Sequence, residues 1–118
     1  MTELELTKEI VKVLDRKKAI DIKAIKITEH SIVADYFVIA SGTSNTHVKS
    51  LANEIEYELG LKGVEPHHIE GRATGWILLD YGTVLVHVFT RETREYYNLE
   101  HLWQDAERVD LSDVLTED

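Results

Sequence analysis

One stretch, residues 34–60 with the sequence ADYFVIASGTSNTHVKSLANEIEYELG, restricts the fold more than any other feature of the chain. It opens with a nearly continuous apolar run, which is typical of a central strand that is buried on both faces. We interpret Gly60 as the C-terminal cap of the helix that follows. The apolar positions of this helix recur at the 3.6-residue period, at Val48, Leu51, Ala52, Ile55 and Leu59.

Two further elements precede this stretch. Apolar residues at roughly helical spacing follow Thr2, which can form a capping box with Glu5, so we expect a first helix over residues 3–17. The alternating sequence AIDIKAIKIT then predicts a strand that begins near Asp21. The order up to residue 60 is therefore helix, strand, strand, helix.

Three strands and a helical segment follow residue 60. A short strand is predicted around residues 68–71. The next two strands, WILLDY and TVLVHVF, are joined at Gly82 and predict a hairpin. The sequence ETREYYNLEHLWQDA predicts one or two short helices, and Asn98 is a suitable cap for the second of them.

The length and composition fit one folded domain. A chain of 118 residues with 43% apolar residues is long enough for a single hydrophobic core. Beyond Ala106 the sequence contains five acidic residues against Arg108. We therefore expect a single domain over residues 1–106 and an acidic, mobile tail over residues 107–118.

The composition also excludes several classes of function. Thirteen basic and 22 acidic residues give a net charge of −9, which repels phosphate backbones and attracts basic partners, so we expect no sequence-specific nucleic-acid binding. Cysteine is absent, which excludes disulfides, thiolate metal sites and a cysteine nucleophile. No apolar run is long enough to span a bilayer, and the acidic N-terminus is unlike a signal peptide, so we expect no membrane association and a cytoplasmic location.

The turn Ser41-Gly42-Thr43-Ser44, between the buried strand and the helix, is a candidate anion site. Backbone N–H groups and the positive end of a helix dipole meet at such a turn, as they do in phosphate-binding loops. However, one glycine and no lysine before Lys49 match neither a Walker loop nor a dinucleotide-binding loop. We favour a structural role, in which Gly42 permits a positive φ and Ser44 caps the helix.

The acidic and histidine residues do not form a recognisable catalytic or metal-binding pattern. Glu54 and Glu56 lie where nucleotidyltransferases carry a metal-binding acid pair, but on a helix two such neighbours point about 200° apart. No two of the six histidines have the i, i+4 spacing of a helical metal site, so we expect no metal and no cofactor. Acid–base chemistry requires that other residues meet in a cleft, and the candidates are Asp35, Glu70, Asp80 and His87.

The predicted hairpin carries the most informative surface. With a two- or four-residue turn, we expect Trp76 opposite His87 and Leu78 opposite Leu85. One face is then wholly aliphatic and belongs to the core. The other face either lies under a helix or is exposed for a partner, and from physics alone we favour the helix because exposed apolar patches are rarer than cores. We call this second face the mixed face, and it consists of Trp76, Leu78, Asp80, Leu85 and His87.

Three blocks of sequence, ADYFVIASGTSNTHV, EGRATGWILLDYGTVLVHVF and REYYNLEHLWQDA, together resemble the ribosomal silencing factor family, also called Iojap-like proteins. The resemblance covers about residues 21–106. It implies an α/β (α+β) fold with a mixed five-stranded sheet flanked by helices, similar to nucleotidyltransferases but without their catalytic acids. Two departures are that Thr83 replaces a frequent acid in the turn and that the residues around Thr93 lack a frequent proline.

The resemblance also implies a function. Members of the family bind the fourteenth protein of the large ribosomal subunit and block joining of the small subunit when nutrients are scarce, and some organellar relatives assist large-subunit assembly. We therefore expect a non-enzymatic translational repressor, with an assembly factor and a nucleotidyltransferase-like enzyme as alternatives. The mixed face is also a candidate for a homodimer off the ribosome.

The expected partner-binding residues follow from the same resemblance together with the mixed face. Tyr96 and Trp103 also match the family motifs, but on an amphipathic helix they suit the core equally well. We expect Trp76 and Leu78 as apolar anchors, Asp80 as the partner of an Arg or Lys, Tyr81 at the tip of the face, and Leu85 and His87 as neighbours.

Overall fold

The structure is a computed structural model, and it describes residues 1–28, 34–71 and 75–116. Its elements follow the predicted order, with one additional strand near the C-terminus. They are α1 (Glu3–Arg16), β1 (Ile20–Lys26), β2 (Tyr36–Gly42), α2 (Asn45–Leu61), β3 (His68–Glu70), β4 (Trp76–Asp80), β5 (Val84–Thr90), α3 (Arg91–Tyr97), α4 (Leu99–Leu102) and β6 (Glu107–Arg108).

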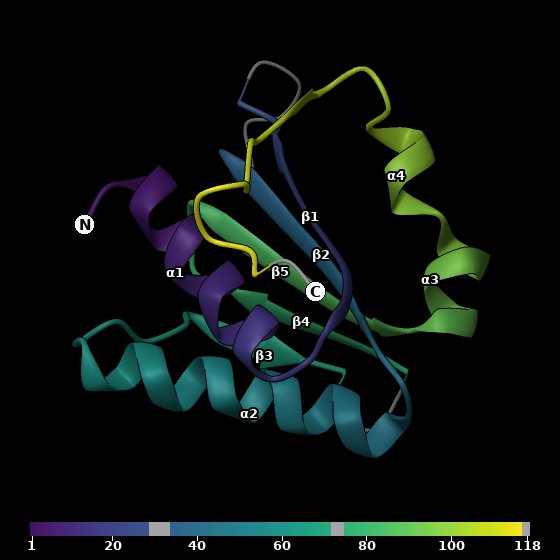
Figure 1. The fold of residues 1–118 in the computed structure, drawn as a ribbon, viewed down its shortest axis with the longest axis horizontal. Helices are drawn as coiled ribbons and strands as arrows, with labels where there is room; N and C mark the ends of the chain where they lie inside the picture. The colour runs from purple at the N-terminus through teal and green to yellow at the C-terminus, as the bar shows by residue number, and fades with distance from the viewer. Residues whose placement is uncertain (29–33, 72–74, 117–118) are drawn as a thin grey trace.

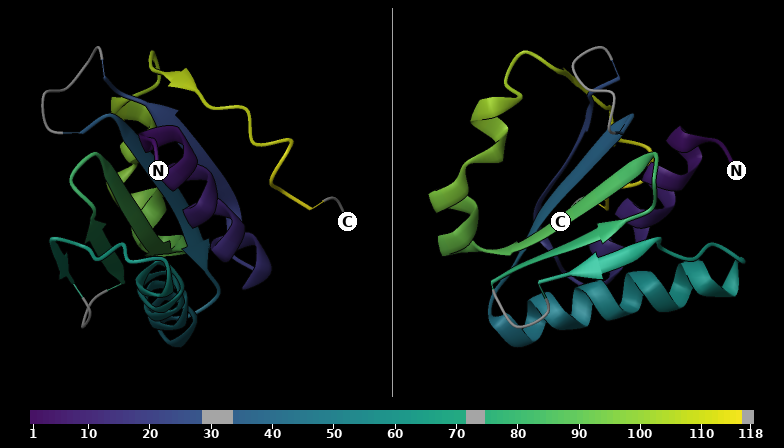
Figure 2. Two further views of the ribbon diagram at one scale, coloured as in Figure 1. Left: turned by 90° about the vertical axis from the view of Figure 1, so that its left-hand side faces the viewer. Right: turned by 180° about the vertical axis from the view of Figure 1, so that it is seen from behind.

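The strands form one mixed sheet in the order β3-β4-β5-β2-β1-β6. The central pair β2–β5 is parallel and the other pairs are antiparallel. Helices α1 and α2 cover one face of this sheet, and the short helices α3 and α4 lie against the other face (Figures 1 and 2). The mixed sheet flanked by helices is therefore confirmed, but it has six strands rather than the expected five.

The sixth strand arises because the domain continues beyond Ala106. The backbone of Glu107–Arg108 pairs with β1, and Leu111 is buried in the core cluster on the α1 side. Further along, the Thr116 backbone N–H donates to a carboxylate oxygen of Asp15 at 3.0 Å. This segment thus differs from the solvated tail that its acidic composition predicts, because the apolar side chains between its acids pack on the domain.

The predicted starts of both long helices are confirmed. At α1, the Glu5 N–H donates to Thr2 Oγ1 at 3.1 Å and the Thr2 N–H donates to Glu5 Oε1 at 3.0 Å, which completes the capping box. At α2, the His47 N–H donates to Ser44 Oγ at 3.1 Å. Asn98 stands at the predicted boundary between the two short helices, but in a left-handed conformation with φ 47° and without a side-chain capping bond.

The end of α2 differs from the prediction. The helix continues through Gly60 to Leu61, and the left-handed residue is Gly63, with φ +79°. The Gly63 N–H donates to the Gly60 carbonyl at 3.0 Å, and the Val64 N–H donates to the Leu59 carbonyl at 2.9 Å. The assignment of Gly60 as the cap is therefore wrong, and Gly63 ends the helix instead.

Gly42 is required for close packing and not for a positive φ. Its φ lies outside the left-handed region, so that part of the prediction is wrong. A Cβ at this position would lie 3.0 Å from Val48 Cγ2 and 3.0 Å from the Val48 backbone nitrogen. The missing side chain lets the end of β2 pass directly against the first turn of α2.

The two glycines of this helical unit are expected to respond in opposite directions to alanine. Gly42→Ala should lower the free energy of unfolding by about 1–2 kcal/mol, because the backbone of α2 has to move to admit the methyl group. Gly60→Ala should raise it by about 0.5 kcal/mol, because a Cβ there meets only Glu65 Oε1 at 3.4 Å and alanine favours the helix. Urea unfolding measures both values, and equal effects of the two substitutions would contradict this account.

Two apolar clusters fill the two sides of the sheet. Alternate residues of β2 enter different clusters, with Val38 and Ala40 facing α1 and α2 and with Phe37 and Ile39 facing α3 and α4. The strand is therefore buried on both faces, as its continuous apolar sequence predicts. The helices on the second face have only seven and four residues, so they leave part of that face over β3 and β4 uncovered.

Candidate functional site

The hairpin of β4 and β5 forms as predicted, but its register is shifted by two residues. Leu78 pairs with His87 rather than with Leu85. The turn is closed by Asp80, whose Oδ1 accepts from the Gly82 N–H at 2.7 Å. Because the shift is an even number, each side chain stays on its predicted face of the sheet. The observed pairs are Trp76–Phe89, Ile77–Val88, Leu78–His87, Leu79–Val86 and Asp80–Leu85.

The mixed face was expected either to lie under a helix or to be exposed for a partner. The first alternative applies to β5 and the second to β4. On β5, Leu85 and His87 are buried beneath the α3–α4 side of the domain. On β4, Trp76, Leu78 and Asp80 remain partly exposed. Leu85 and His87 therefore do not lie at the surface, where the prediction placed them as neighbours of a partner.

Tyr81 does not lie at the tip of the mixed face. Its side chain is buried in the opposite cluster, with Ile77 and Leu79 beneath α1 and α2. Burial raises the pKa of its hydroxyl well above the usual range, and the charges of Glu56 and Glu65 add to this effect. The alternation of the strand, continued past Asp80, gives the same placement, because Tyr81 is in phase with Leu79.

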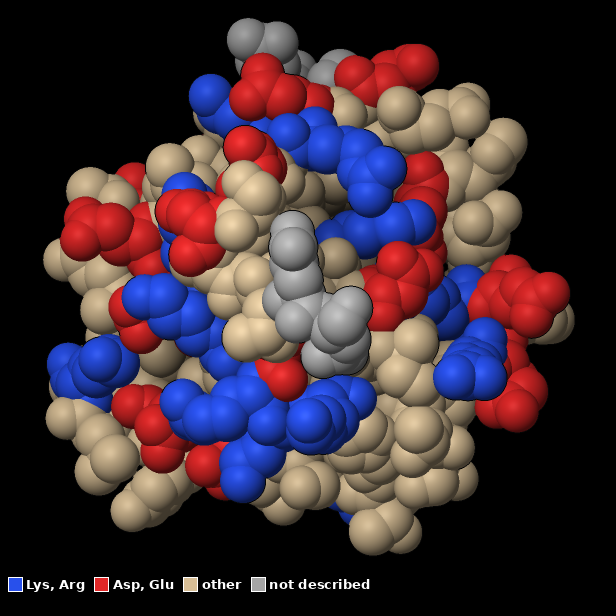
Figure 3. All heavy atoms as spheres, viewed as in Figure 1, with Lys and Arg blue, Asp and Glu red and all other residues tan. Residues whose placement is uncertain are grey.

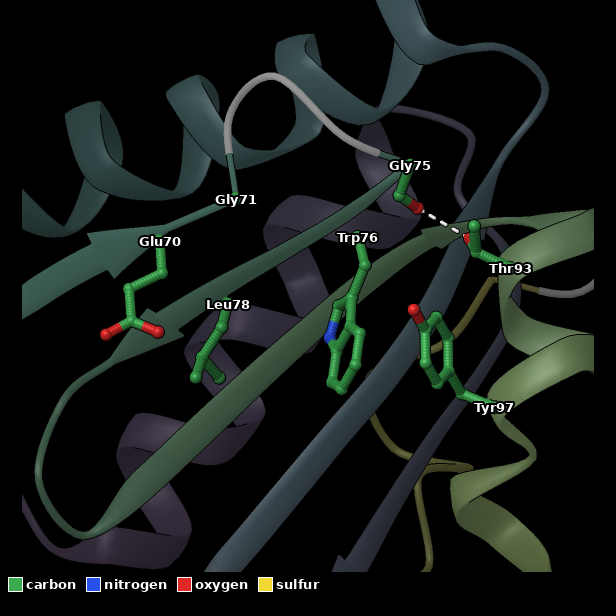
Figure 4. A pocket seen from close by; sticks show the side chains of 7 residues that line it. All are labelled: Glu70, Gly71, Gly75, Trp76, Leu78, Thr93 and Tyr97. Atoms are coloured by element: carbon green, nitrogen blue, oxygen red, sulfur yellow. Dashed lines mark hydrogen bonds between the residues drawn. The ribbon is translucent and has the colours of Figure 1, made fainter.

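A groove of about 370 Å³ lies on the open part of the mixed face (Figure 4). The indole of Trp76 lies at its centre, and the Tyr97 ring forms one wall, with 4.7 Å between ring centroids. A hydrogen bond of 2.6 Å from Thr93 Oγ1 to the Gly75 carbonyl holds α3 against the start of β4. We call this the Trp76 groove; it is lined by Glu70, Gly71, Gly75, Trp76, Leu78, Thr93 and Tyr97.

A cluster of charged and polar side chains borders the Trp76 groove on β3. His68 Nε2 lies 3.3 Å from Asp80 Oδ2 and 3.4 Å from Glu70 Oε1. The three meet because His68 pairs with Asp80 across β3 and β4 while Glu70 pairs with Leu78. A groove with a partly exposed indole and with two carboxylates along its border suits a partner that offers both an apolar and a cationic side chain.

The four acid–base candidates do not form one cleft. Glu70 and Asp80 come together around His68, whereas His87 is buried beneath Trp76. Asp35 lies just before β2, where its backbone N–H donates to the Thr83 carbonyl at 2.8 Å. The sequence did not single out His68 as a site residue, although period two places it on the same side of β3 as Glu70.

The two aromatic residues left open by the sequence have different surroundings. Trp103 packs edge to face on Phe37, with ring centroids 5.4 Å apart, and so belongs to the core on the α4 side. Tyr96 is exposed, and its ring makes an edge contact with Tyr97 at 5.0 Å. Tyr96 therefore extends the aromatic surface beside the Trp76 groove.

The stability of the protein is expected to fall in mild acid because of His87. Burial lowers the pKa of this imidazole to about 4, whereas in the unfolded chain it is close to 6.5. Between these values the unfolded chain binds a proton that the folded chain excludes, so the free energy of unfolding should drop by up to about 3 kcal/mol from pH 6.5 to pH 4. Below pH 4 this loss is complete.

The measurement is urea unfolding of the wild type and His87→Asn at several pH values between 7 and 3.5. The other ionisable groups titrate in both proteins, so the difference between the two curves isolates His87. Glu100, whose pKa is lowered from 4.5 to about 2 mainly by its hydrogen bond with Arg94, loses its contribution to stability below pH 4.5, and it does so in both proteins. Parallel curves for the two proteins would show that His87 is not the cause.

The turn between β2 and α2 serves the architecture of the domain. The Thr43 N–H donates to His47 Nδ1 at 2.9 Å, and His47 Nε2 lies 3.0 Å from the Lys17 carbonyl. Ser41 Oγ accepts from Arg94 Nη1 at 2.9 Å. The polar groups that an anion would need are thus engaged within the protein, which supports the structural interpretation.

The comparison with nucleotidyltransferases also fails at the acid pair. Glu54 and Glu56 both lie within α2, and Glu54 Oε1 is 3.8 Å from Lys17 Nζ. Within residues 1–28, 34–71 and 75–116, no three His, Asp or Glu side chains are grouped so that they could hold a metal ion. The described part of the chain also contains no helix with the length and apolar character that a membrane span needs.

Fold and site together define a small α+β domain with a surface groove suited to binding another macromolecule. The sequence model of the family described as "Ribosomal silencing factor during starvation" matches residues 1–118. The chain is 38% identical over 117 residues to a ribosomal silencing factor from Halalkalibacterium halodurans, covering 98% of this chain and 100% of the relative. The chain thus belongs to the ribosomal silencing factor family, whose members are regulatory proteins of the ribosome.

Two further comparisons bear on fold and function. A crystal structure of a protein from Chromobacterium violaceum superposes with a TM-score of 0.85, at 33% identity and with 88% of each chain covered. A mouse protein named "Mitochondrial assembly of ribosomal large subunit protein 1" is 35% identical over 98 residues, which is 80% of this chain and 43% of the mouse protein.

Proposed function

We propose that the protein docks through the Trp76 groove on the fourteenth protein of the large ribosomal subunit and blocks joining of the small subunit. Translation then falls when nutrients are scarce. The observation that carries the proposal is the Trp76 groove itself, which a partly exposed indole, Leu78 and Glu70 line together, with Asp80 and His68 at its border. Membership of the ribosomal silencing factor family supplies the ribosome as partner.

The chemistry of the Trp76 groove fits a protein partner. Trp76 and Leu78 offer apolar anchors, and Asp80 offers a partly buried carboxylate to an Arg or Lys of the partner. The net charge of −9 favours capture of a basic ribosomal protein. Blocking requires no bond to be made or broken, because a folded body of 34 × 33 × 33 Å excludes the small subunit from the space it occupies.

The charge distribution argues against nucleic acid as the primary partner. On the face seen in Figure 3, basic side chains stand among acidic ones. Several are joined in ion pairs, including Lys8 with Asp113 and Lys23 with Glu100, each at 2.8 Å. Phosphate contacts at these lysines would have to displace the bound carboxylates.

The test combines co-sedimentation with purified large subunits and light scattering after small subunits are added. Wild type should pellet with large subunits and suppress subunit joining. Leu78→Asp, in the Trp76 groove, should do neither, because it places a charge in the interface core. Leu61→Asp is the matched control, since Leu61 is 68% exposed on α2, on the other side of the sheet. Failure of wild type to pellet at micromolar concentration would refute the proposal.

An assembly role through the same surface is the second candidate, favoured by the name of the mouse relative. Depletion of the protein separates the two roles. Loss of a silencing factor leaves mature large subunits that join freely, whereas loss of an assembly factor leaves immature large subunits.

In either role the protein acts where ribosomes act, in the cytoplasm. Sedimentation of the free protein tests whether the mixed face forms a homodimer off the ribosome.

A further inference from the structure

The side of the Trp76 indole that faces the sheet contacts buried side chains that a docking partner does not reach. Its indole stacks on Phe89, with ring centroids 5.1 Å apart and an interplanar angle of 28°. Its Nε1 lies 3.1 Å from Nδ1 of His87, which is only 5% exposed and stands on β5, between β4 and β2 in the sheet. The exposed anchor of the Trp76 groove therefore rests on an aromatic layer that belongs to the core.

The hydrogen bond fixes which nitrogen of the imidazole carries the proton. An indole N–H can only donate, so His87 Nδ1 accepts, and in the neutral ring the proton is then on Nε2. Nε2 is buried and has no hydrogen-bond partner among the residues that the structure describes. The ring of Phe37 meets the imidazole at 4.8 Å with an interplanar angle of 65°.

Packing alone does not explain a histidine at position 87. A buried donor without an acceptor destabilises a core, and an aliphatic side chain would fill the same place without that cost. The only hydrogen bond that the structure gives to the His87 ring, within its described residues, is the one from Trp76. What histidine adds at this position is therefore an acceptor directed at the indole.

We propose that His87 is a positioning residue, which holds the indole of Trp76 in one orientation before the partner arrives. The inference rests on the proposed function, in which Trp76 is the apolar anchor. Without the acceptor, the indole N–H loses its hydrogen bond to His87, and this contact no longer selects one orientation of the ring. Because a preorganised side chain loses less freedom on binding, loss of the acceptor should speed dissociation from large subunits by about tenfold.

Two substitutions of nearly equal size separate the acceptor from the rest of the side chain. His87→Asn places an amide oxygen near the position of Nδ1, whereas His87→Leu offers no acceptor. The chain contains two tryptophans, so in a Trp103→Phe background the remaining indole N–H signal in NMR belongs to Trp76. Nitrogen chemical shifts of His87 report the protonated nitrogen, and labelled protein released from purified large subunits gives the dissociation rate.

We expect the proton on Nε2 and a slowly exchanging Trp76 indole N–H in both the parent protein and His87→Asn. In His87→Leu, indole exchange should be about tenfold faster and dissociation about tenfold faster, with His87→Asn close to the parent. A proton on Nδ1, or faster indole exchange in His87→Leu without faster dissociation, would overturn the inference. If His87→Leu does not fold by circular dichroism, fast indole exchange in the folded His87→Asn overturns it equally.

Failure of the proposed function gives a different result. In that case the parent protein does not bind large subunits at all, although the NMR signals still show whether His87 holds the indole. The spectroscopic and binding measurements therefore distinguish a wrong docking partner from a wrong role for His87.

Discussion

Trp76→Ala is expected to weaken binding to large ribosomal subunits by about 100-fold or more. Central aromatic anchors in protein interfaces cost about 2–4 kcal/mol when they are truncated, and each 1.4 kcal/mol corresponds to a factor of ten in the dissociation constant. Trp76 has the features of such an anchor, because it lies at the centre of the Trp76 groove and is backed by Phe89 and Tyr97. Titration of labelled protein with purified large subunits measures the dissociation constant.

The control is Tyr57→Ala, which removes an aromatic side chain that is 61% exposed on α2, on the other side of the sheet. It should bind within about twofold of wild type, since exposed residues outside an interface contribute little. Circular dichroism checks that both variants are folded. If the two substitutions weaken binding equally, the Trp76 groove is not the docking surface.

Features set by local periodicity could be predicted from the sequence. The predictions of the capping box formed by Thr2 and Glu5 and of the N-cap at Ser44 are confirmed, because each depends on residues within one helical turn. The faces of the hairpin were correct because alternation does not change when the register shifts by two residues. The register itself depends on the conformation of the turn, which a single glycine does not fix.

Features set by distant contacts could not be predicted in the same way. Leu111 is buried because β6 pairs with the edge strand β1 and so brings the following residues onto the domain. Nothing in the local acidic sequence indicates that pairing. The burial of His87 likewise depends on where α3 and α4 settle on the sheet. Within the candidate site, alternation predicts the shared face of Trp76, Leu78 and Asp80 on β4, whereas Tyr81 lies on the opposite face from the one expected, and the burial of Leu85 and His87 depends on distant contacts.

Arg94 joins α3 and α4 to the sheet through several polar contacts. It is only 8% exposed, and its Nε donates to Glu100 Oε1 at 2.9 Å. Its Nη1 donates to Ser41 Oγ at 2.9 Å, and its Nη2 lies 3.6 Å from Asp21 Oδ2. Lys23 completes the network, with its Nζ 2.8 Å from the other oxygen of Glu100. One buried guanidinium thus joins α3 and α4 to β1 and β2.

Arg94→Met is expected to lower the free energy of unfolding by about 3 kcal/mol, because it removes the charge that the surrounding oxygens were arranged to receive. Arg94→Lys should recover only part of this loss, since an ammonium cannot bond to Glu100 and Ser41 with the geometry of the guanidinium fork. Urea unfolding at pH 7 measures the three proteins. In Arg94→Met the pKa of Glu100 should also rise from about 2 toward its ordinary value.

The matched control is Arg91→Met, which changes an exposed arginine one turn earlier on α3 and should alter stability by no more than about 0.5 kcal/mol. Because Tyr97 lies one turn after Arg94 and forms a wall of the Trp76 groove, Arg94→Met should also weaken docking, but less than Trp76→Ala does. Equal stability of the Arg94 and Arg91 variants would show that α3 is held by its apolar contacts alone. Reduced stability with unchanged docking would show that the wall formed by Tyr97 is not needed to bind the ribosome.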